Sequence, residues 1–202
     1  LLCFGLTAGD FECAYQMDGP ADQARGLLFN RKHTLLDPYA KAVTGQRNWG
    51  EKPEGGKDFV YKARVVQSDF DWGRYRNLNY KFEDLVIYEM HVRGFTKDAS
   101  SGVKGGGTFE GLRQKIPYLK DLGINAVELM PIFEFDEMES ARVVDGVQLY
   151  NYWGYNTVSF FAPNTSYAFH QEHNHEGDEL KRLIRELKEN GIEVILDVVF
   201  NH

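Results

Sequence analysis

The sequence predicts an α/β protein in which the later strands of a β-sandwich precede the first three strands of an incomplete (β/α)8 barrel. Three observations predict this. Turn signals crowd residues 1–80 without a long helical period. Apolar runs of strand length occur at 84–92, 124–132 and 192–200. Helical patterns separate these runs, and this order is typical of parallel strands joined by crossover helices.

The first part of the chain combines short apolar stretches with frequent turns. Residues 11–18 and 59–66 are the clearest strand candidates, and a connector without periodicity follows them. We therefore expect residues 1–80 to form the C-terminal part of a β-sandwich plus a connector. The second domain, residues 81–202, should be the N-terminal part of the barrel.

The first helical pattern runs from the candidate N-cap Thr108 to the stop residue Gly123. Its apolar residues repeat at helical spacing, at Leu112, Ile116 and Leu119. Pro117 lies inside the pattern, and because proline lacks the backbone N–H that a helix interior uses, it should kink or split this helix.

The second helical pattern, residues 177–191, is followed at once by an apolar run. It places four apolar side chains on one face, Leu180, Leu183, Ile184 and Leu187. The strings LKDLGINAVELMP and LKENGIEVILDVV are thus two copies of one helix–glycine–strand unit. Near-continuous apolar strands of this kind are expected to be covered on both faces.

A doubly wound sheet and a (β/α)8 barrel both fit the order of elements. The charged residues inside the strands, Glu89, Glu128 and Asp197, favour the barrel, whose interior tolerates such groups when they are paired. A complete barrel takes about 250 residues and eight strands. We therefore expect this chain to be a piece of a longer protein.

Composition restricts the class of partner. The net charge is −7, and the 23 Lys and Arg residues are scattered, which argues against nucleic acid and against a membrane surface. No apolar run approaches the roughly 20 residues of a membrane span. Aromatic residues make up 14% of the chain, which suits a neutral sugar ligand as well as a large core. Cys3 and Cys13 are expected to be reduced thiols.

Polar residues close the last apolar run in the string ILDVVFNH, residues 195–202. Asn201 and His202 should lie where the strand turns into its loop, at the barrel end that holds active sites. There His202 can donate to a substrate hydroxyl, and Asp197 can orient its neighbours. A paired core aspartate and a surface histidine explain the spacing equally well.

A second candidate region is rich in aromatic residues. Six of the twelve positions from Tyr150 to Phe161 are aromatic, and glycine and asparagine interrupt them. Such rings could stack on sugars over a cleft. The alternative is a long loop folded on its own small aromatic core.

Three further motifs have ordinary explanations. The glycine-rich residues 101–108 lack the ending of a phosphate-binding loop and should be a connection. His170, His173 and His175 could bind a metal, but a solvated loop is expected. The acidic residues 133–140 could attract calcium, but solvated carboxylates are expected.

Taken together, several strings resemble one family. DVVFNH, residues 197–202, looks like the first conserved signature of the α-amylase superfamily of glycoside hydrolases, and WGYN, residues 153–156, resembles its Gly-Tyr element. VIYEMHVRGFT and GINAVELMPIFEFDEME are similar to isoamylase-type debranching enzymes, including bacterial glycogen debranching enzymes. RGLLFNRKHTLLDPYAKAV, residues 25–43, resembles the end of their carbohydrate-binding-module-like sandwich.

The resemblance implies roles for individual residues. His202 would hydrogen-bond the glucose unit at the cleavage subsite, Asp197 would brace that subsite, and Tyr155 would stack on the same sugar with Trp153 nearby. Asn201 matches a position that ligates calcium in many α-amylases. Many debranching relatives lack this ion, so the resemblance leaves calcium undecided and implies no other cofactor.

The resemblance also implies a function. It points to retaining hydrolysis of α-1,6 linkages in a branched α-glucan such as glycogen. It favours the bacterial cytoplasm as the location and leaves a plastid open. The mechanism needs two carboxyl groups about 5 Å apart, and the resemblance places both beyond residue 202, so no catalytic residue is expected in this chain. A glucan-branching enzyme of the same superfamily and an inert glucan-binding fragment are the alternatives.

Overall fold

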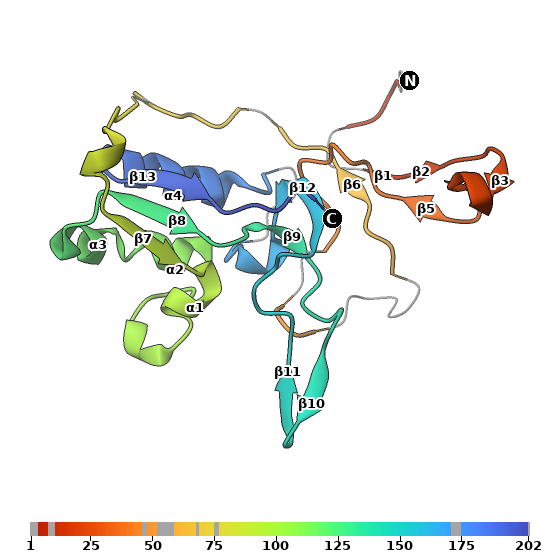
Figure 1. Cartoon of the computed structure of the whole chain (residues 1–202). Coiled ribbons are helices and arrows are strands. Elements are labelled where there is room, and N and C mark those ends of the chain that lie inside the picture. The colour runs from red at the N-terminus through yellow and green to blue at the C-terminus, as the bar shows by residue number, and fades with distance from the viewer. Residues whose placement is uncertain are drawn as a thin grey trace.

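A computed structural model describes residues 4–7, 11–45, 48–51, 59–67, 69–74, 77–170 and 175–201. Figure 1 shows two kinds of region. A parallel sheet with its helices occupies one side of the molecule, and small antiparallel pairs from the start of the chain occupy the other.

The parallel sheet contains the three predicted strands, β7 (Ile87–Met90), β8 (Ala126–Leu129) and β13 (Glu193–Leu196). The spatial order is β13-β8-β7, and both pairs are parallel. The mixed α/β prediction with a parallel sheet is therefore confirmed, and the barrel is not closed by the described residues.

The predicted helices also form. Thr108 caps α2 (Phe109–Arg113) by accepting the Gly111 N–H at 3.3 Å, and α4 (Asp178–Glu189) covers the second pattern. The first pattern is split before Pro117 into α2 and α3 (Ile116–Leu122). Pro117 stands in the first turn of α3, where its missing N–H would have no partner in the helix. A one-turn helix, α1 (Val92–Thr96), follows β7.

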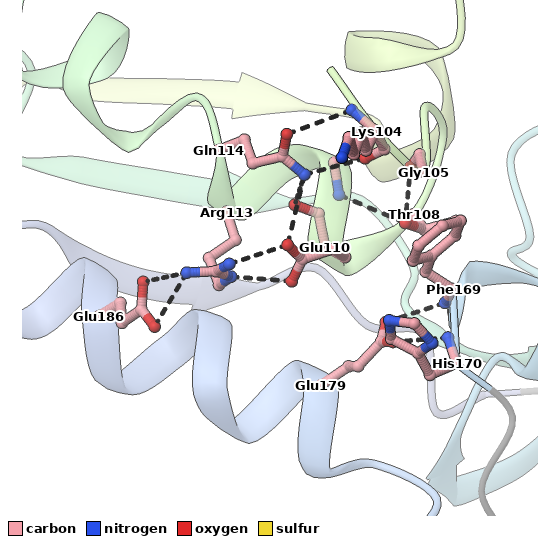
Figure 2. A network of polar contacts seen from close by, with 11 residues as sticks. Lys104, Gly105, Thr108, Glu110, Arg113, Gln114, Phe169, His170, Glu179 and Glu186 are labelled. Atoms are coloured by element: carbon pink, nitrogen blue, oxygen red, sulfur yellow. Dashed lines mark hydrogen bonds and ion pairs between the residues drawn. The ribbon is translucent and has the colours of Figure 1, made fainter.

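An arginine joins two of these helices. The Arg113 guanidinium donates to Glu110 at 2.8 Å on its own helix and to Glu186 of α4 at 2.9 Å (Figure 2). These two carboxylates raise the pKa of Arg113. The part-buried pair therefore fixes α2 against α4, which share the main core.

The main core lies between one face of the sheet and the helices. Its buried residues are Met90, Val92, Phe109, Leu112, Ile116, Leu119, Ile124, Val127, Leu129, Ile132, Phe135, Tyr167, Leu180, Leu183, Leu187 and Ile192. Ile184, the fourth apolar residue predicted on the α4 face, packs against this core and is partly buried.

The other face of the sheet is open. Glu89 lies opposite Glu128 in the register of β7 and β8, and Ile87 is 41% exposed. The expected coverage on both faces is therefore wrong for the described residues, because their helices pack on one face only. Helices on a single face are typical of a wall of a (β/α)8 barrel rather than of a doubly wound sheet.

The first part of the chain forms three antiparallel pairs of two-residue strands. They are β1 (Glu12–Cys13) with β6 (Ala63–Arg64), β2 (Tyr15–Gln16) with β5 (Thr34–Leu35), and β3 (Ala21–Asp22) with β4 (Leu27–Leu28). The antiparallel pairing agrees with the sequence analysis, while the sandwich and the domain boundary near residue 80 stay predictions. Cys13 is a free, exposed thiol, and Cys3 lies outside the described residues.

Another antiparallel pair of strands lies between the two regions (Figure 1). It consists of β9 (Phe133–Phe135) and β12 (Thr157–Pro163), and bulges interrupt its register. Ala162 of β12 packs with Ala40, Val43 and Ala63 in a second, smaller core. The strand β12 therefore connects the early region to the parallel sheet.

A β-hairpin projects from the body of the molecule (Figure 1). Its strands are β10 (Arg142–Val144) and β11 (Val147–Leu149), and its turn residues Asp145 and Gly146 have φ of 50° and 78°. Positive φ at both central residues is the pattern of a tight hairpin turn. Across the described residues, no helix is both long and apolar enough to cross a membrane.

Candidate functional site

Asp197 and Tyr155 meet at the carboxyl end of the parallel sheet. The Asp197 N–H donates to the Leu129 carbonyl at 2.9 Å, which continues the β13–β8 pairing one residue beyond β13. The Tyr155 hydroxyl donates to Oδ2 of Asp197. Two residues that the sequence separates by 42 positions are thus brought together by the fold.

The electrostatic surroundings keep this tyrosine protonated. The hydrogen bond to Asp197 raises the pKa of Tyr155 to about 12, and partial burial and the charges of Asp197, Glu89 and Glu128 act in the same direction. Ionising the phenol would add a negative charge beside three carboxylates. At neutral pH, Tyr155 is therefore a hydrogen-bond donor and Asp197 is its acceptor.

The loop before β12 depends on a glycine. Gly154 is buried with a φ of 81°, and a Cβ atom built on it would lie 2.5 Å from the Phe135 ring. Only glycine fits both the backbone conformation and this close packing. The loop is fixed further by the Asn151 N–H, which donates to the Glu137 carbonyl at 2.9 Å.

His91, directly after β7, supports the aromatic residues of this loop. Its ring stacks on Tyr152 with centroids 4.0 Å apart and planes 9° apart. The Gly94 N–H donates to Nδ1 at 3.0 Å, so Nε2 must hold the ring proton and donate to the Tyr152 carbonyl at 2.7 Å. Burial lowers the pKa of His91, which agrees with a neutral ring.

Trp153 stands at the outer edge of this support. Its ring meets Tyr152 edge to face at 5.2 Å and lies 6.4 Å from the His91 ring. It is 53% exposed. A half-exposed indole on a rigid base is suited to apolar contact with a ligand.

The aromatic stretch combines both interpretations that the sequence left open. Tyr150 and Tyr152 contact the core rings Trp49 and His91, whereas Trp153 projects into solvent and Tyr155 reaches Asp197. The inner aromatic residues position the outer ones.

Two carboxylates of the acidic stretch 133–140 have a structural role. Glu134 and Glu137 are fully buried, so the expectation that they are solvated is wrong. Glu134 accepts the Thr165 N–H at 2.6 Å, and Glu137 accepts the Gly50 N–H at 3.0 Å. Buried carboxylates need such donors, and these come from distant segments of the chain.

The structure places His202 and the candidate metal ligands of the sequence only in part. His202 and His173 lie outside the described residues. Asn201 is exposed and already has a polar or ring contact. Nowhere in the described part of the chain do three His, Cys, Asp or Glu side chains gather as metal ligands, and the calcium question stays open.

Sequence analysis missed His91. The only signal was its position, a polar residue immediately after a buried strand, which it shares with Asp197. It also treated Glu89 and Glu128 as barrel-interior groups without placing them close to Tyr155, where their charges act on the phenol.

Similarity to known proteins assigns the chain to a family. The model of the α-amylase catalytic domain matches residues 59–202. The chain belongs to the α-amylase family. It is 44% identical to the chloroplastic isoamylase 3 of Oryza sativa subsp. japonica over 98% of the chain and 26% of that protein. It is 36% identical to the glycogen operon protein GlgX homolog of Mycobacterium tuberculosis (strain ATCC 25618 / H37Rv), over 93% of the chain and 28% of that protein.

Solved structures of α-amylase-family relatives agree with these matches. Pullulanase from Anoxybacillus sp. LM18-11 in complex with maltotetraose superposes with a TM-score of 0.65 at 33% identity, over 84% of this chain and 24% of that one. A product complex of the glycogen-degrading pneumococcal virulence factor SpuA gives 0.63 at 31%, over 84% and 19%. The chain therefore spans about a quarter of the length of the curated relatives that it matches.

Proposed function

We propose that the chain is part of a hydrolase that cleaves α-1,6 linkages in a branched α-glucan such as glycogen. The observation that supports this most directly is the Tyr155–Asp197 contact at the carboxyl end of the sheet, with Trp153 half-exposed on the loop that carries Tyr155. The relatives of this chain include proteins named isoamylase, glycogen debranching enzyme and pullulanase.

In this proposal each residue has a distinct role toward one glucose unit. The ring of Tyr155 stacks on the sugar, and its hydroxyl, protonated up to a pH of about 12, holds the Asp197 carboxylate in place. Asp197 retains acceptor capacity for sugar hydroxyls. Trp153 adds an apolar face nearby, and His202 donates to the same sugar.

The catalytic nucleophile and the acid/base are proposed to lie outside these 202 residues. Retaining hydrolysis needs a nucleophile and an acid/base that face each other across the scissile bond. Glu89, Glu128 and Asp197 surround a tyrosine that keeps its proton, and none of them is assigned either catalytic role.

The test uses the protein expressed from its complete reading frame. Loss of branch points from glycogen is measured for the wild type and for Tyr155→Phe and Asp197→Asn. We expect each variant to lower kcat/KM by at least about tenfold, because each removes a charge-assisted hydrogen bond at the sugar. Tyr118→Phe, at a 50% exposed tyrosine of α3, is the matched control and should keep wild-type activity.

The alternatives predict other outcomes of the same assay. Transfer of chains into new branches without net hydrolysis would identify a branching enzyme instead. The chain of 202 residues, assayed alone, is expected to bind glucan without turning it over. Hydrolysis by this chain alone would show that the nucleophile and the acid lie within it.

The cytoplasm is the location that we propose, as the bacterial resemblance implies. The rice relative is named chloroplastic, so a plastid is the competing location. Fractionation of the source organism with an antibody against this chain decides between them.

A further inference from the structure

A second cleft lies beside the helices α1 and α2. Its volume is about 700 Å³, within the range of small-molecule sites. Its lining includes Trp49, Arg93, Lys97, Phe169 and His170. Tyr155, Asp197 and Trp153 are absent from the described lining, so this cleft is separate from the proposed glucan subsite.

The walls of this cleft are held by hydrogen bonds (Figure 2). The Glu179 carboxylate at the start of α4 accepts the N–H groups of Phe169 and His170, at 2.9 and 2.7 Å. The hydroxyl of Thr108, another lining residue, donates to the Gly105 carbonyl at 2.7 Å. The Phe169 ring packs against Gly105, where an added Cβ would lie 2.8 Å away. These contacts hold the lining of the cleft in place before any ligand binds.

Two cations lie side by side in the cleft. Arg93 and Lys97 are four residues apart, and the side chains of both pass over Gly107, where a Cβ would be 3.3 Å from Arg93 Nη1 and 3.1 Å from Lys97 Cδ. The Arg93 guanidinium lies over the Trp49 ring at 4.6 Å from its centroid, and the Trp49 ring is itself stacked with Tyr167, with planes 12° apart. The arginine is thus fixed by stacking, with its N–H groups at the ring edges available.

Within the described residues, neither cation has a close carboxylate partner. Among the residues that the structure describes, no carboxylate forms an ion pair with Arg93 or Lys97 and no acceptor bonds their side-chain N–H groups. Glu137 is near enough to act on Arg93 through space, but one of its carboxylate oxygens accepts the Gly50 N–H. Burial lowers the pKa of Arg93. Two neighbouring cations without an ion-pair partner among the described residues form a site that favours an anion.

The rest of the cleft indicates what the anion is attached to. Phe169, another lining residue, is 45% exposed. A bare ion would leave this ring and most of the 700 Å³ unused. A guanidinium fork and an ammonium group match the oxygens of a phosphate, and an aromatic ring matches the apolar face of a sugar. We propose that this cleft binds a phosphate monoester carried by a sugar, with the phosphate at Arg93 and Lys97 and the sugar against Phe169.

Calorimetric titration of the full chain tests this proposal. Glucose 6-phosphate and a phosphorylated maltodextrin are compared with glucose and the unphosphorylated dextrin, because the phosphate could belong to a free sugar or to a polymer. We expect binding that depends on the phosphate and weakens with added salt. Whichever phosphorylated ligand binds identifies the source, and binding of neither would overturn the proposal. Inorganic phosphate should bind more weakly than the ester, and equal affinity would refute the sugar contact.

Variants of Lys97 supply the second measurement. Lys97 is exposed, so Lys97→Ala should fold normally and weaken the phosphate-dependent binding by about tenfold. Lys97→Arg should restore most of the affinity. Lys104→Ala is the control, since Lys104 is exposed and its side chain is outside the lining. Equal affinity of the wild type and Lys97→Ala would count against the assignment.

Discussion

The region from residue 84 onward and the region before residue 68 bury their side chains in different ways. All sixteen residues of the main core lie between Met90 and Ile192. In the early region, two-residue strands leave Leu28 73% and Leu35 46% exposed. Two-stranded pairs this short are not independently stable.

The early region is held in place by the later one. Its buried alanines and valine pack on Ala162 of β12. Arg64, on β6, pairs with Glu176 before α4 at 3.0 Å, and both side chains are largely buried. The later region is stabilised by helices and strands whose apolar faces form the main core. The early region is held in position by a few long-range contacts with the later one.

The largest effect should come from the main core. Leu183→Ala removes a fully buried side chain of α4, and we expect the free energy of unfolding to fall by about 3 kcal/mol. Leu28→Ala, at the 73% exposed leucine of β4, should change it by less than about 0.5 kcal/mol. Urea unfolding of both variants measures the difference between their losses of unfolding free energy. Equal losses would show that the two regions do not differ in this way.

The link between the regions should give the next largest effect. Arg64→Met removes the pairs with Glu176 and Glu12 and should lower the unfolding free energy by about 2 kcal/mol. Arg31→Met is the matched control, because Arg31 and its partner Asp18 are 76% and 70% exposed. That variant should be nearly neutral. Proteolysis of residues 11–67 should accelerate in Arg64→Met only, and unchanged cleavage would argue against the link.

Two glycines of the later region allow the cost of a packing clash to be separated from the cost of backbone strain. Gly154→Ala combines a φ of 81° with a clash against Phe135, whereas Gly146→Ala has a φ of 78° and open space around it. Both should lose about 1 kcal/mol to backbone strain, and the clash should cost Gly154→Ala a further 1 to 2 kcal/mol or so. Thermal unfolding of the two variants isolates the packing contribution. Identical losses would mean that the Phe135 ring moves away freely.

The smallest effect concerns acid. Burial depresses the pKa of His91 from 6.5, so below that pH the unfolded chain binds a proton that the folded chain does not. The contribution of neutral His91 to the unfolding free energy should therefore be fully present above pH 6.5. It should decline as the pH falls from 6.5 toward the lower pKa of the folded state. His91→Asn keeps an acceptor for the Gly94 N–H and removes the titration. Its unfolding free energy should show a shallower slope below pH 6.5, and parallel slopes would exclude His91 as the cause.

The elements of the later region could be predicted because their signals are local. The repeat of Leu180, Leu183 and Leu187 defines α4, and the glycines Gly123 and Gly191 mark where helices end. Asp197 lies inside the last apolar run of the sequence, and the polar residues Asn201 and His202 that close this run indicate the sheet end that holds active sites. The resemblance, rather than any pattern of spacing, paired Tyr155 with Asp197.

The remaining features depend on segments that meet only in the folded chain. Nothing near Glu137 in sequence indicates that the Gly50 N–H will reach its carboxylate, 87 residues away. His91 likewise depends on Tyr152, 61 positions later. A single sequence offers no measure of such pairings, so an acidic stretch looked solvated and a stacked histidine passed unnoticed.

The strand order β13-β8-β7 has a consequence for how the protein forms during synthesis. Strand β8 pairs with β7, and β13 pairs with β8, so each strand of this sheet adds to a parallel strand that has already been translated. The sheet can therefore grow as the chain leaves the ribosome. The pair β1–β6 works differently, because Glu12 must wait for Arg64 to be translated. The residues of β1 are therefore translated well before their partners in β6, and they stay unpaired until those partners have been made.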